Sequence, residues 1–229
     1  GRVPEEVFTS EFKPPTTDGS GRNRRNLHAA GDLLEAAGWL LQDGRRGSAA
    51  SGEALTFEIL YFSPTFERVF GPYVRNLERL GITVSLRLVD PSQYIKRLEE
   101  YDFDITTQRF VQQLSPGAEL WNYFGSAAAD QRGAFNLAGI KHPVVDRLIG
   151  KVLAAPDRGS MKIAARALDR VLLWGNYIVP QWYKGSHGLV YWNKFSRPAI
   201  LAKYNLSLDT WWFDEKKAEK LTAFRKSLN

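Results

Sequence analysis

Apolar residues between positions 55 and 88 change from one spacing to another, and the change predicts a strand, a helix and a second strand. Residues 55–62 form a hydrophobic run that is compatible with a β-strand. Ser63-Pro64 then supplies an N-cap residue and a proline suited to the first helical position. Apolar residues at helical spacing follow, namely Phe66, Val69, Phe70, Tyr73, Val74, Leu77 and Leu80. Gly81 ends this stripe, and residues 82–88 alternate as a second strand.

A second crossover is predicted directly after this pair of strands. Asp90-Pro91, with Gln93 three residues after the aspartate, resembles a capping box at the start of a helix. Residues 94–100 are then a short helix, and residues 103–110 are the third strand. Three strands joined by two helices with short connections predict a parallel sheet with right-handed crossovers. The predicted fold class is therefore α/β, with a mostly parallel βαβαβ sheet flanked by helices.

Further helices and loops are expected around this unit. Residues 1–24 are rich in proline and glycine and are expected to be extended. A helix is predicted over residues 27–37, ended by Gly38, and residues 43–52 are predicted to be a polar loop. Two more helices are predicted, one opened by Pro143 and one capped by Ser160.

The last fifty residues give a weaker pattern. Residues 177–183 and 188–192 are predicted strands, and the sequence is irregular from Ser196 onward. The charged tail after residues 211–213 is compatible with a helix.

Composition fits a folded protein with a basic surface. The chain has 229 residues, 44% of them hydrophobic and 24% charged, which is enough for one large domain or one domain with extensions. Lysine and arginine exceed aspartate and glutamate by 31 − 25 = 6. The densest basic groups, at residues 22–25 and 45–46, lie in glycine- and serine-rich stretches. We therefore interpret them as solvated surface rather than as a nucleic-acid-binding arm.

The sequence excludes cysteine chemistry and contains no membrane or export signal. There are no cysteines, so disulfides, thiolate metal sites and cysteine nucleophiles are absent. No apolar run approaches the roughly 20 residues of a spanning helix, and the start has no hydrophobic signal-peptide region. The chain begins with an extended, proline-containing segment and no initiator methionine. We expect a processed or truncated chain.

Enzyme motifs are missing as well. The three histidines, His28, His142 and His187, are far apart and have no metal-ligand spacing. No phosphate-binding loop, dinucleotide fingerprint or nucleophile elbow is present. The acidic group at residues 99–104 is expected to be an exposed helix end followed by the start of a strand. We predict a protein that is not an enzyme and needs no cofactor or metal, with a hydrolase of unrecognised site left as an alternative.

Polar and aromatic residues follow the predicted third strand and suggest a binding site. In open α/β sheets, ligands bind outside the carboxyl ends of the strands. The candidate ligand-binding residues are Tyr61, Ser63, Arg109, Phe110, Val111, Gln112, Gln113, Ser115, Trp121 and Asn136. The alternative is that the rings are core and the glutamines are solvated surface, and composition alone favours it.

Several segments, taken in order, resemble a known family. They are LLEAAGW at residues 33–39, the βαβαβ unit, YDFDI at 101–105, Gly133 and Asn136, HPVVDRLI at 142–149 and IVPQWY at 178–183. This order is similar to the C-terminal lobe of family 5 extracellular solute-binding proteins, the peptide-, dipeptide- and nickel-binding components of ABC importers. Residues 115–117, 121, 125–131 and 209–212 most resemble the subgroup that imports oligopeptides and microcin C.

Two departures from the family qualify this resemblance. Members commonly have Gly-Trp where this chain has Arg109-Phe110, and oligopeptide binders often follow with an aspartate that pairs with the ligand's ammonium group. Gln113 stands at that position here, and a neutral amide lacks the charge assistance that roughly doubles such a bond. The family's N-terminal lobe is also missing. We expect residues 1–229 to be a single C-terminal lobe, with a core at 25–184 and extended or hinge-crossing segments at 1–24 and 185–229.

The resemblance implies a function in periplasmic solute uptake. Two lobes would close on a peptide or peptide-like solute and deliver it to ABC permease subunits in the membrane. Val111, Gln112 and Gln113 would supply backbone and amide hydrogen bonds, and Phe110 and Trp121 would cover ligand side chains. Arg109 would hold an acidic group, with a solvated or salt-bridging role as the alternative. The net charge leaves a nucleic-acid-binding domain as the runner-up, although we expect no nucleic-acid partner.

Overall fold

The computed structural model divides the chain into two compact units, which are described separately. Unit 1 is Gly1–Val179 and unit 2 is Pro180–Asn229. The structure describes residues 2–112, 115–183, 185–186, 188–201 and 206–227. None of the helices in these ranges is long and apolar enough to cross a membrane.

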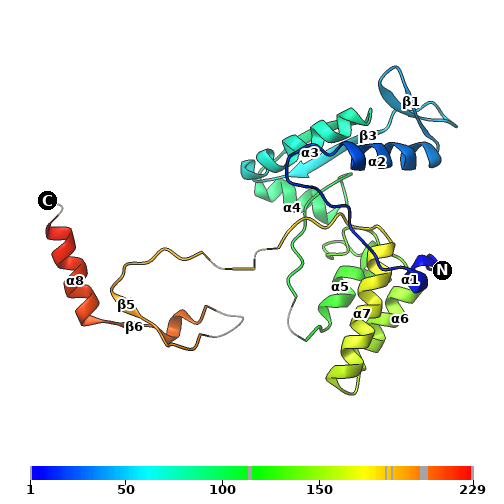
Figure 1. Cartoon of the computed structure of the whole chain (residues 1–229). Coiled ribbons are helices and arrows are strands. Elements are labelled where there is room, and N and C mark those ends of the chain that lie inside the picture. The colour runs from blue at the N-terminus through cyan, green and yellow to red at the C-terminus, as the bar shows by residue number, and fades with distance from the viewer. Residues whose placement is uncertain (1, 113–114, 184, 187, 202–205, 228–229) are drawn as a thin grey trace. The chain divides into compact units, whose positions relative to one another are not determined.

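A small parallel sheet forms the centre of the first half of unit 1. Strand β3 (Thr56–Tyr61) pairs in parallel with β4 (Thr83–Leu88), with Ile59 opposite Leu86. The connection between them is the 3-10 turn η1 (Pro64–Phe66) and helix α3 (Glu67–Arg79). Helix α4 (Pro91–Glu99) follows β4, and Figure 1 shows α3 and α4 on opposite sides of β3. The predicted strand–helix–strand order and the α/β class are confirmed.

The third strand is shorter than predicted. Within residues 103–110, only Ile105 joins the sheet, through one parallel bridge to Ile59. The Ile105 carbonyl accepts a hydrogen bond from the Leu60 N–H at 2.8 Å. The Thr106 hydroxyl then donates to the Leu60 carbonyl at 3.2 Å, an acceptor that a continuing parallel ladder would use. At the point where the ladder stops, a side-chain hydroxyl therefore bonds this acceptor in place of a backbone N–H.

Alternate residues of β3 face two separate clusters. Ile59 and Tyr61 pack with Phe70 and Val74 of α3. Leu60 points the other way and packs with Val89 and with Tyr94 of α4. The period of two along the strand therefore fixes both helices to the sheet.

A group of helices forms the second part of unit 1, and it includes one helix from the start of the chain. Its helices are α1 (Glu6–Thr9), α5 (Glu119–Phe124), the 3-10 helix η2 (Ser126–Asp130), α6 (Pro143–Leu153) and α7 (Arg158–Trp174). They share one core of Val7, Leu120, Ile140, Val145, Ile149, Val152, Leu168 and Val171. The pattern of apolar residues did not predict helices at residues 119–130, but Leu120 docks on this core and Ala128 is buried.

The helix starts follow the predicted logic, with two corrections. The Asp90 carboxylate accepts hydrogen bonds from the Ser92 and Gln93 N–H groups, as the capping pattern predicts. Asp157, rather than Ser160, caps α7 and accepts from the backbone of Gly159 and Ser160. Ser63 occupies the N-cap position of η1, but its side chain makes no capping bond.

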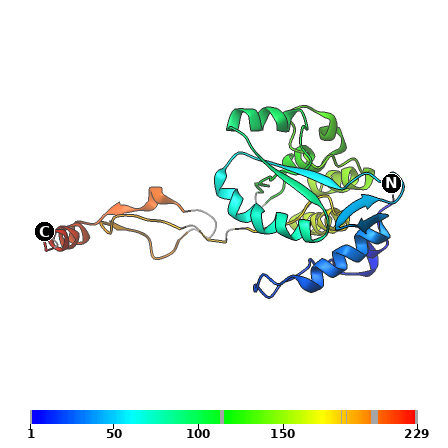
Figure 2. The same ribbon diagram turned by 90° about the horizontal axis from the view of Figure 1, so that it is seen from above.

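The start of unit 1 contains a hairpin where a loop was predicted. Helix α2 (Arg24–Ala36) leads into β1 (Trp39–Gln42), which pairs antiparallel with β2 (Arg45–Ser48). Asp43 and Gly44 both have positive φ, as a two-residue hairpin turn requires. The hairpin lies beside α2 at the periphery of the unit (Figure 2).

One buried arginine fastens this hairpin. The Arg46 side chain is 4% exposed, and its guanidinium donates to the carbonyls of Leu80 and Trp39. It also pairs with the Glu35 carboxylate at 3.2 Å. The polar composition of residues 43–52 suggested a loop, because the sequence does not show which distant residues Arg46 contacts.

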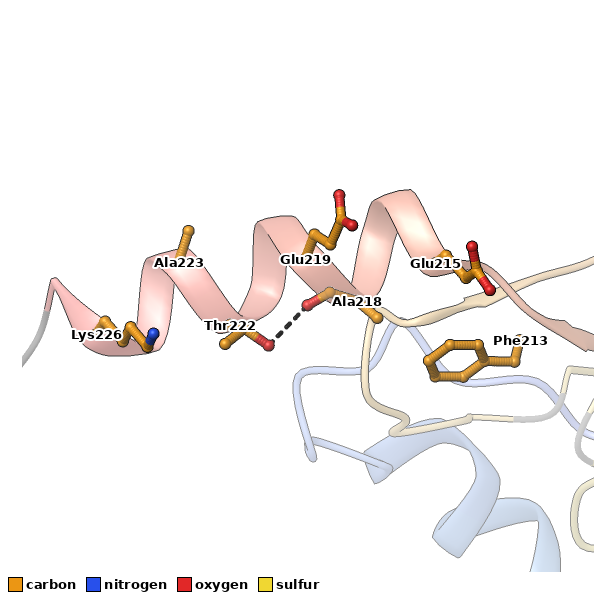
Figure 3. A pocket seen from close by; sticks show the side chains of 7 residues that line it. All are labelled: Phe213, Glu215, Ala218, Glu219, Thr222, Ala223 and Lys226. Atoms are coloured by element: carbon orange, nitrogen blue, oxygen red, sulfur yellow. Dashed lines mark hydrogen bonds between the residues drawn. The ribbon is translucent and has the colours of Figure 1, made fainter.

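Unit 2 has little internal structure. A two-residue pair joins β5 (Phe195–Ser196) to β6 (Trp212–Phe213), with η3 (Leu208–Thr210) before β6. Helix α8 (Glu215–Lys226) follows, as the charged tail suggested, and the Asp214 carboxylate accepts from the Lys217 N–H at its start. Figure 3 shows one open hollow along α8, lined by Phe213, Glu215, Ala218, Glu219, Thr222, Ala223 and Lys226.

The strands predicted at residues 177–183 and 188–192 do not form in the described part of these segments. Their apolar side chains have no facing strand, and Val179 and Tyr183 are 70% and 90% exposed. A strand needs a hydrogen-bonding neighbour, and the described residues supply none here.

Candidate ligand-binding site

The candidate site is the edge of unit 1 where the parallel strands end. β3 ends at Tyr61, and residues 106–112 leave the sheet in the same direction after the Ile105 bridge. The Phe62 ring packs on Tyr94 with 4.9 Å between centroids. Both chain segments therefore reach the edge that the sequence predicted.

Tyr94 fixes the first part of this edge. Its hydroxyl lies 2.8 Å from the Thr106 hydroxyl and donates to the Thr107 carbonyl at 3.1 Å. The ring is buried in the cluster below β3. Tyr94 was not among the predicted site residues, because helical spacing places it in α4 but does not show bonds to Thr106 and Thr107, twelve and thirteen positions away.

Tyr61 and Ser63 occupy the end of β3, and Tyr61 is directed inward. The Tyr61 ring is buried edge-on against Phe70, and its hydroxyl donates to Glu67 Oε1 at 3.2 Å. Burial, and secondly the bond to Glu67, raises the pKa of the Tyr61 phenol. Tyr61 is therefore a neutral core residue whose proton is committed to Glu67. Ser63 is half-buried.

An aromatic cluster packs around Phe110, which belongs to the segment that leaves the sheet. We define it as Phe110, Tyr123, Phe124 and Phe135. The Phe110 ring stacks on Phe124 at 5.6 Å and meets the edge of Tyr123 at 5.3 Å. Tyr123 also contacts Phe135 at 6.2 Å. Gln108 joins the two sides, because its Nε2 donates to the Phe135 carbonyl at 3.0 Å. Phe110 is half-buried in this cluster, so its ring both packs and borders the edge.

The polar candidates after Phe110 are open to solvent. Val111 is 64% exposed, and Gln112 and Ser115 are exposed as well. Arg109 is exposed and makes no ion pair with any residue in the described ranges. Gln113 lies outside the described residues. This segment therefore presents a guanidinium, an amide and free backbone groups.

Trp121 and Asn136 differ in accessibility. Trp121, on α5, is 40% exposed, and its ring crosses Gly125 so closely that a Cβ there would lie 2.7 Å from Cε3. Asn136 is fully buried. Its amide donates to the Gly125 and Ile140 carbonyls, and its oxygen accepts from the Ile140 N–H at 2.9 Å. Asn136 thus ties the end of α5, which carries Trp121, to the loop after Phe135, and its own groups are already paired.

The described side chains of this edge include rings, a guanidinium and an amide. Among the described residues, no group of three or more histidine, cysteine, aspartate or glutamate side chains could hold a metal ion. Rings together with a guanidinium and an amide suit a solute that has both apolar and polar parts.

The fold is shared with periplasmic binding proteins of known structure. A mannohexaose-bound periplasmic oligopeptide-binding protein from Thermotoga maritima matches with a TM-score of 0.63, 20% identity, and 79% of this chain and 33% of that one covered. The oligopeptide-binding protein AppA from Bacillus subtilis, in complex with a nonapeptide, matches at 0.62 and 14%, over 91% of this chain and 40% of that one. The lobe is therefore of the type II periplasmic-binding-protein kind, as predicted.

Sequence relatives point to the same kind of protein as the structural comparisons, and they align with nearly all of this chain. The probable peptide-binding protein YejA of Agrobacterium fabrum is 44% identical over 92% of this chain and 34% of the relative. The chain spans about a third of the length of the curated relatives it matches. These comparisons give the nucleic-acid alternative no support. The profile of bacterial extracellular solute-binding proteins, family 5 Middle, matches residues 2–131, more than half of the chain. The chain belongs to the family 5 bacterial extracellular solute-binding proteins.

Proposed function

We propose that this chain is one lobe of a two-lobed protein that captures a peptide or peptide-like solute for an ABC importer. The observation that carries the proposal is the similarity to YejA of Agrobacterium fabrum, named as a probable peptide-binding protein, over nearly the whole chain. Solute-binding proteins of this family are extracellular, so the site of action would be the periplasm, with permease subunits as membrane partners. The function would be binding and delivery, without catalysis.

The exposure of the candidate site supports the proposal that this lobe provides one half of a ligand-binding site. Val111, Gln112 and Ser115 are open, and Arg109 has no carboxylate partner among the described residues. A single open edge leaves a bound solute in contact with water on one side. Closure of a second lobe would remove that water, which strengthens each polar contact. We infer that the Tyr61–Ser63 end of β3 and the segment after Ile105 form one wall of the closed site.

The exposed surface of unit 2 supports the proposal that unit 2 packs against a second lobe of the protein. None of the described residues of unit 2 is buried. Large side chains are exposed along it, among them Tyr183, Trp192, Trp212, Phe213 and Phe224. A stretch of fifty residues cannot fold stably without burying a core. We propose that unit 2 packs on the rest of the protein, with residues 25–184 as the core of the C-terminal lobe and residues 185–229 crossing to the other lobe. The expected crossing of residues 1–24 is not part of this proposal, because Val7 of α1 is buried in the helical core of unit 1.

The residues at the site also suggest what part of a peptide is recognised. Gln113, a neutral amide, stands where oligopeptide binders of this family often have an aspartate, so a free ammonium group would gain little. Arg109 offers a planar guanidinium, which fits a carboxylate with two parallel bonds. Acidic or carboxyl-terminal groups of the solute would be held by Arg109, while Phe110 and Trp121 would cover its side chains.

The test is calorimetry on the whole protein, of which we propose that this chain is one lobe, against a peptide library. Peptides with a free C-terminal carboxylate should bind, and blocking that carboxylate should weaken binding about tenfold, which is the loss expected for one charge-assisted bond. The same tenfold loss is expected for R109Q, whereas R132Q, an exposed arginine held by Glu99 and Glu100, serves as the matched control. Mannohexaose should give no heat. Binding of the oligosaccharide but of no peptide would refute the proposed solute class.

A further inference from the structure

Helix α7 carries a row of cations on its outer side. Arg158, Lys162, Arg166 and Arg170 follow one another at intervals of four residues. This interval places neighbouring charges about 6 Å apart along the helix axis, so the row extends over about 18 Å. The first three side chains are exposed. Arg170, at the end of the row, donates to the backbone carbonyls of Val7 and Ser10 and holds the start of the chain.

The exposed part of the row is not neutralised by the protein itself. Among the described residues, no carboxylate lies within ion-pair distance of Arg158, Lys162 or Arg166. Two carboxylates are near in sequence. Asp157 is occupied as the cap of α7, and Asp169 is exposed and unpaired beside the row. Helix α6, which packs against α7, adds the exposed cations Arg147 and Lys151.

Stability of the helix does not explain this arrangement. Like charges four residues apart face each other on a helix surface and destabilise it. The opposite side of α7 carries Leu168 and Val171, both buried in the helical core. The helix is therefore fixed with its apolar side inward, and the exposed cations face away from the helical core.

The chemistry of the face indicates a flat anionic surface. Protein interfaces are centred on buried aromatic or aliphatic anchors in pockets. Across α7, all of which the structure describes, Ile163 is the single large apolar side chain that is strongly exposed, at 71%. Cations of one sign at regular spacing, without an anchor, match a layer of anionic lipid headgroups, which attracts them without needing a defined shape.

We propose that the outer face of α7, through Arg158, Lys162 and Arg166, is an electrostatic docking surface for membranes containing anionic phospholipids. Binding is peripheral, because the apolar side of the helix stays in the core and only the charges reach the headgroups. The contribution of each cation falls off within a Debye length, so the attraction weakens as salt is added. The proposal does not depend on which solute the protein carries.

The experiment is vesicle sedimentation with the full chain, using phosphatidylglycerol-rich vesicles and vesicles of phosphatidylcholine alone. The unaltered protein should bind the anionic vesicles at low salt and leave the neutral ones in solution. Each Lys or Arg near the surface is worth about fivefold in affinity, so the R158Q/K162Q/R166Q variant should bind roughly a hundredfold more weakly. High salt should remove the difference between the two proteins.

A control variant separates position from net charge. R22Q/R24Q/R25Q removes the same three charges from exposed positions at the start of α2 and should retain binding to anionic vesicles. Circular dichroism should be unchanged in both triple variants, and the melting temperature should not fall in either. Equal loss in both variants, or equal binding to neutral vesicles, would overturn the proposal. Binding to polyglutamate but not to vesicles, with dependence on Arg158, Lys162 and Arg166, would also overturn it and point to an acidic protein partner.

Discussion

The two units of this chain bury their apolar residues to very different extents. Unit 1 closes one core among its helices and two smaller clusters around β3, with Ile59, Leu60, Val145 and Ile149 fully buried. The described part of unit 2 has large aromatic side chains, and none of its residues is buried. Apolar content alone therefore does not make a folded unit. Chain topology must bring the apolar faces together, and only unit 1 does so by itself.

The contacts inside unit 2 illustrate what a segment can do without a core. Tyr191 meets Trp211 edge-on at 4.9 Å, and the Arg225 guanidinium lies over the Trp192 ring at 5.3 Å. The Trp211 indole nitrogen is enclosed but has no hydrogen-bond partner among the described residues. Such contacts contribute about 1 kcal/mol each. A few of them together do not offset the conformational entropy lost when fifty residues become ordered. The difference between the units is the physical reason for proposing that unit 2 packs on another part of the protein.

The largest effect should come from opening a cavity in the core of unit 1. I149A removes a fully buried side chain between α6 and α7 and should lower the free energy of unfolding by about 2–5 kcal/mol. I163A, on the exposed side of α7, should change it by less than about 0.5 kcal/mol. F213A, in unit 2, should leave the main unfolding transition unchanged. Equal destabilisation by I149A and F213A in urea unfolding would erase the contrast between the units.

The next effect tests the buried amide that holds the site loop. N136A leaves the Ile140 N–H and two carbonyls without their partners and should cost about 3 kcal/mol. N122A is the matched control, because its exposed amide accepts a single bond at 3.3 Å from Phe135 and should cost under about 1 kcal/mol. Thermal melts of the two variants decide whether Asn136 supports unit 1 or only borders the site.

A smaller effect is expected at the start of α4. D90A removes the carboxylate that accepts from the Ser92 and Gln93 N–H groups and should cost about 1 kcal/mol. D90N keeps a capping oxygen and should cost only a few tenths of a kcal/mol. If both substitutions were silent in urea unfolding, the βαβ half of unit 1 would not limit its stability.

The smallest effect concerns acid stability. Hydrogen bonds from the Ser160 backbone and hydroxyl, and then from the Gly159 backbone, lower the pKa of Asp157 below its ordinary 3.8. The stabilisation is present above that ordinary value and is lost as pH falls through the lowered folded-state pKa. D157N keeps the cap without titrating, so its melting temperature should fall less with acid than that of the unaltered protein. D214N makes the same change at α8, where the Ser196 hydroxyl chiefly lowers the pKa, and should not alter the transition of unit 1.

Local signals in the sequence predicted the regular part of unit 1. The stripe from Phe66 to Leu80, the alternation at residues 82–88 and the Asp90 cap each depend on neighbours within a few positions, and each formed as predicted. The failures involve distant partners. The hairpin depends on Arg46 reaching Leu80, the third strand ends where Thr106 reaches Leu60, and the strands predicted after Tyr177 have no described neighbour to pair with.

The candidate site shows the same division. Its position at the strand ends followed from chain order, and the exposure of Val111 and Gln112 agrees with a binding edge. Polar residue type, however, does not show whether the group is free. Asn136 and Tyr61 resembled ligand contacts in sequence, yet both direct their polar groups at the protein's own chain. Only three-dimensional packing separates a free amide from a committed one.

The most direct test of the account compares the solute affinity of this chain with that of the whole protein, by titrating both with the same peptide. We predict that the whole protein binds with measurable heat, and that residues 1–229 alone bind far more weakly or not at all. Micromolar binding by the isolated chain, equal to that of the whole protein, would contradict a shared site between two lobes.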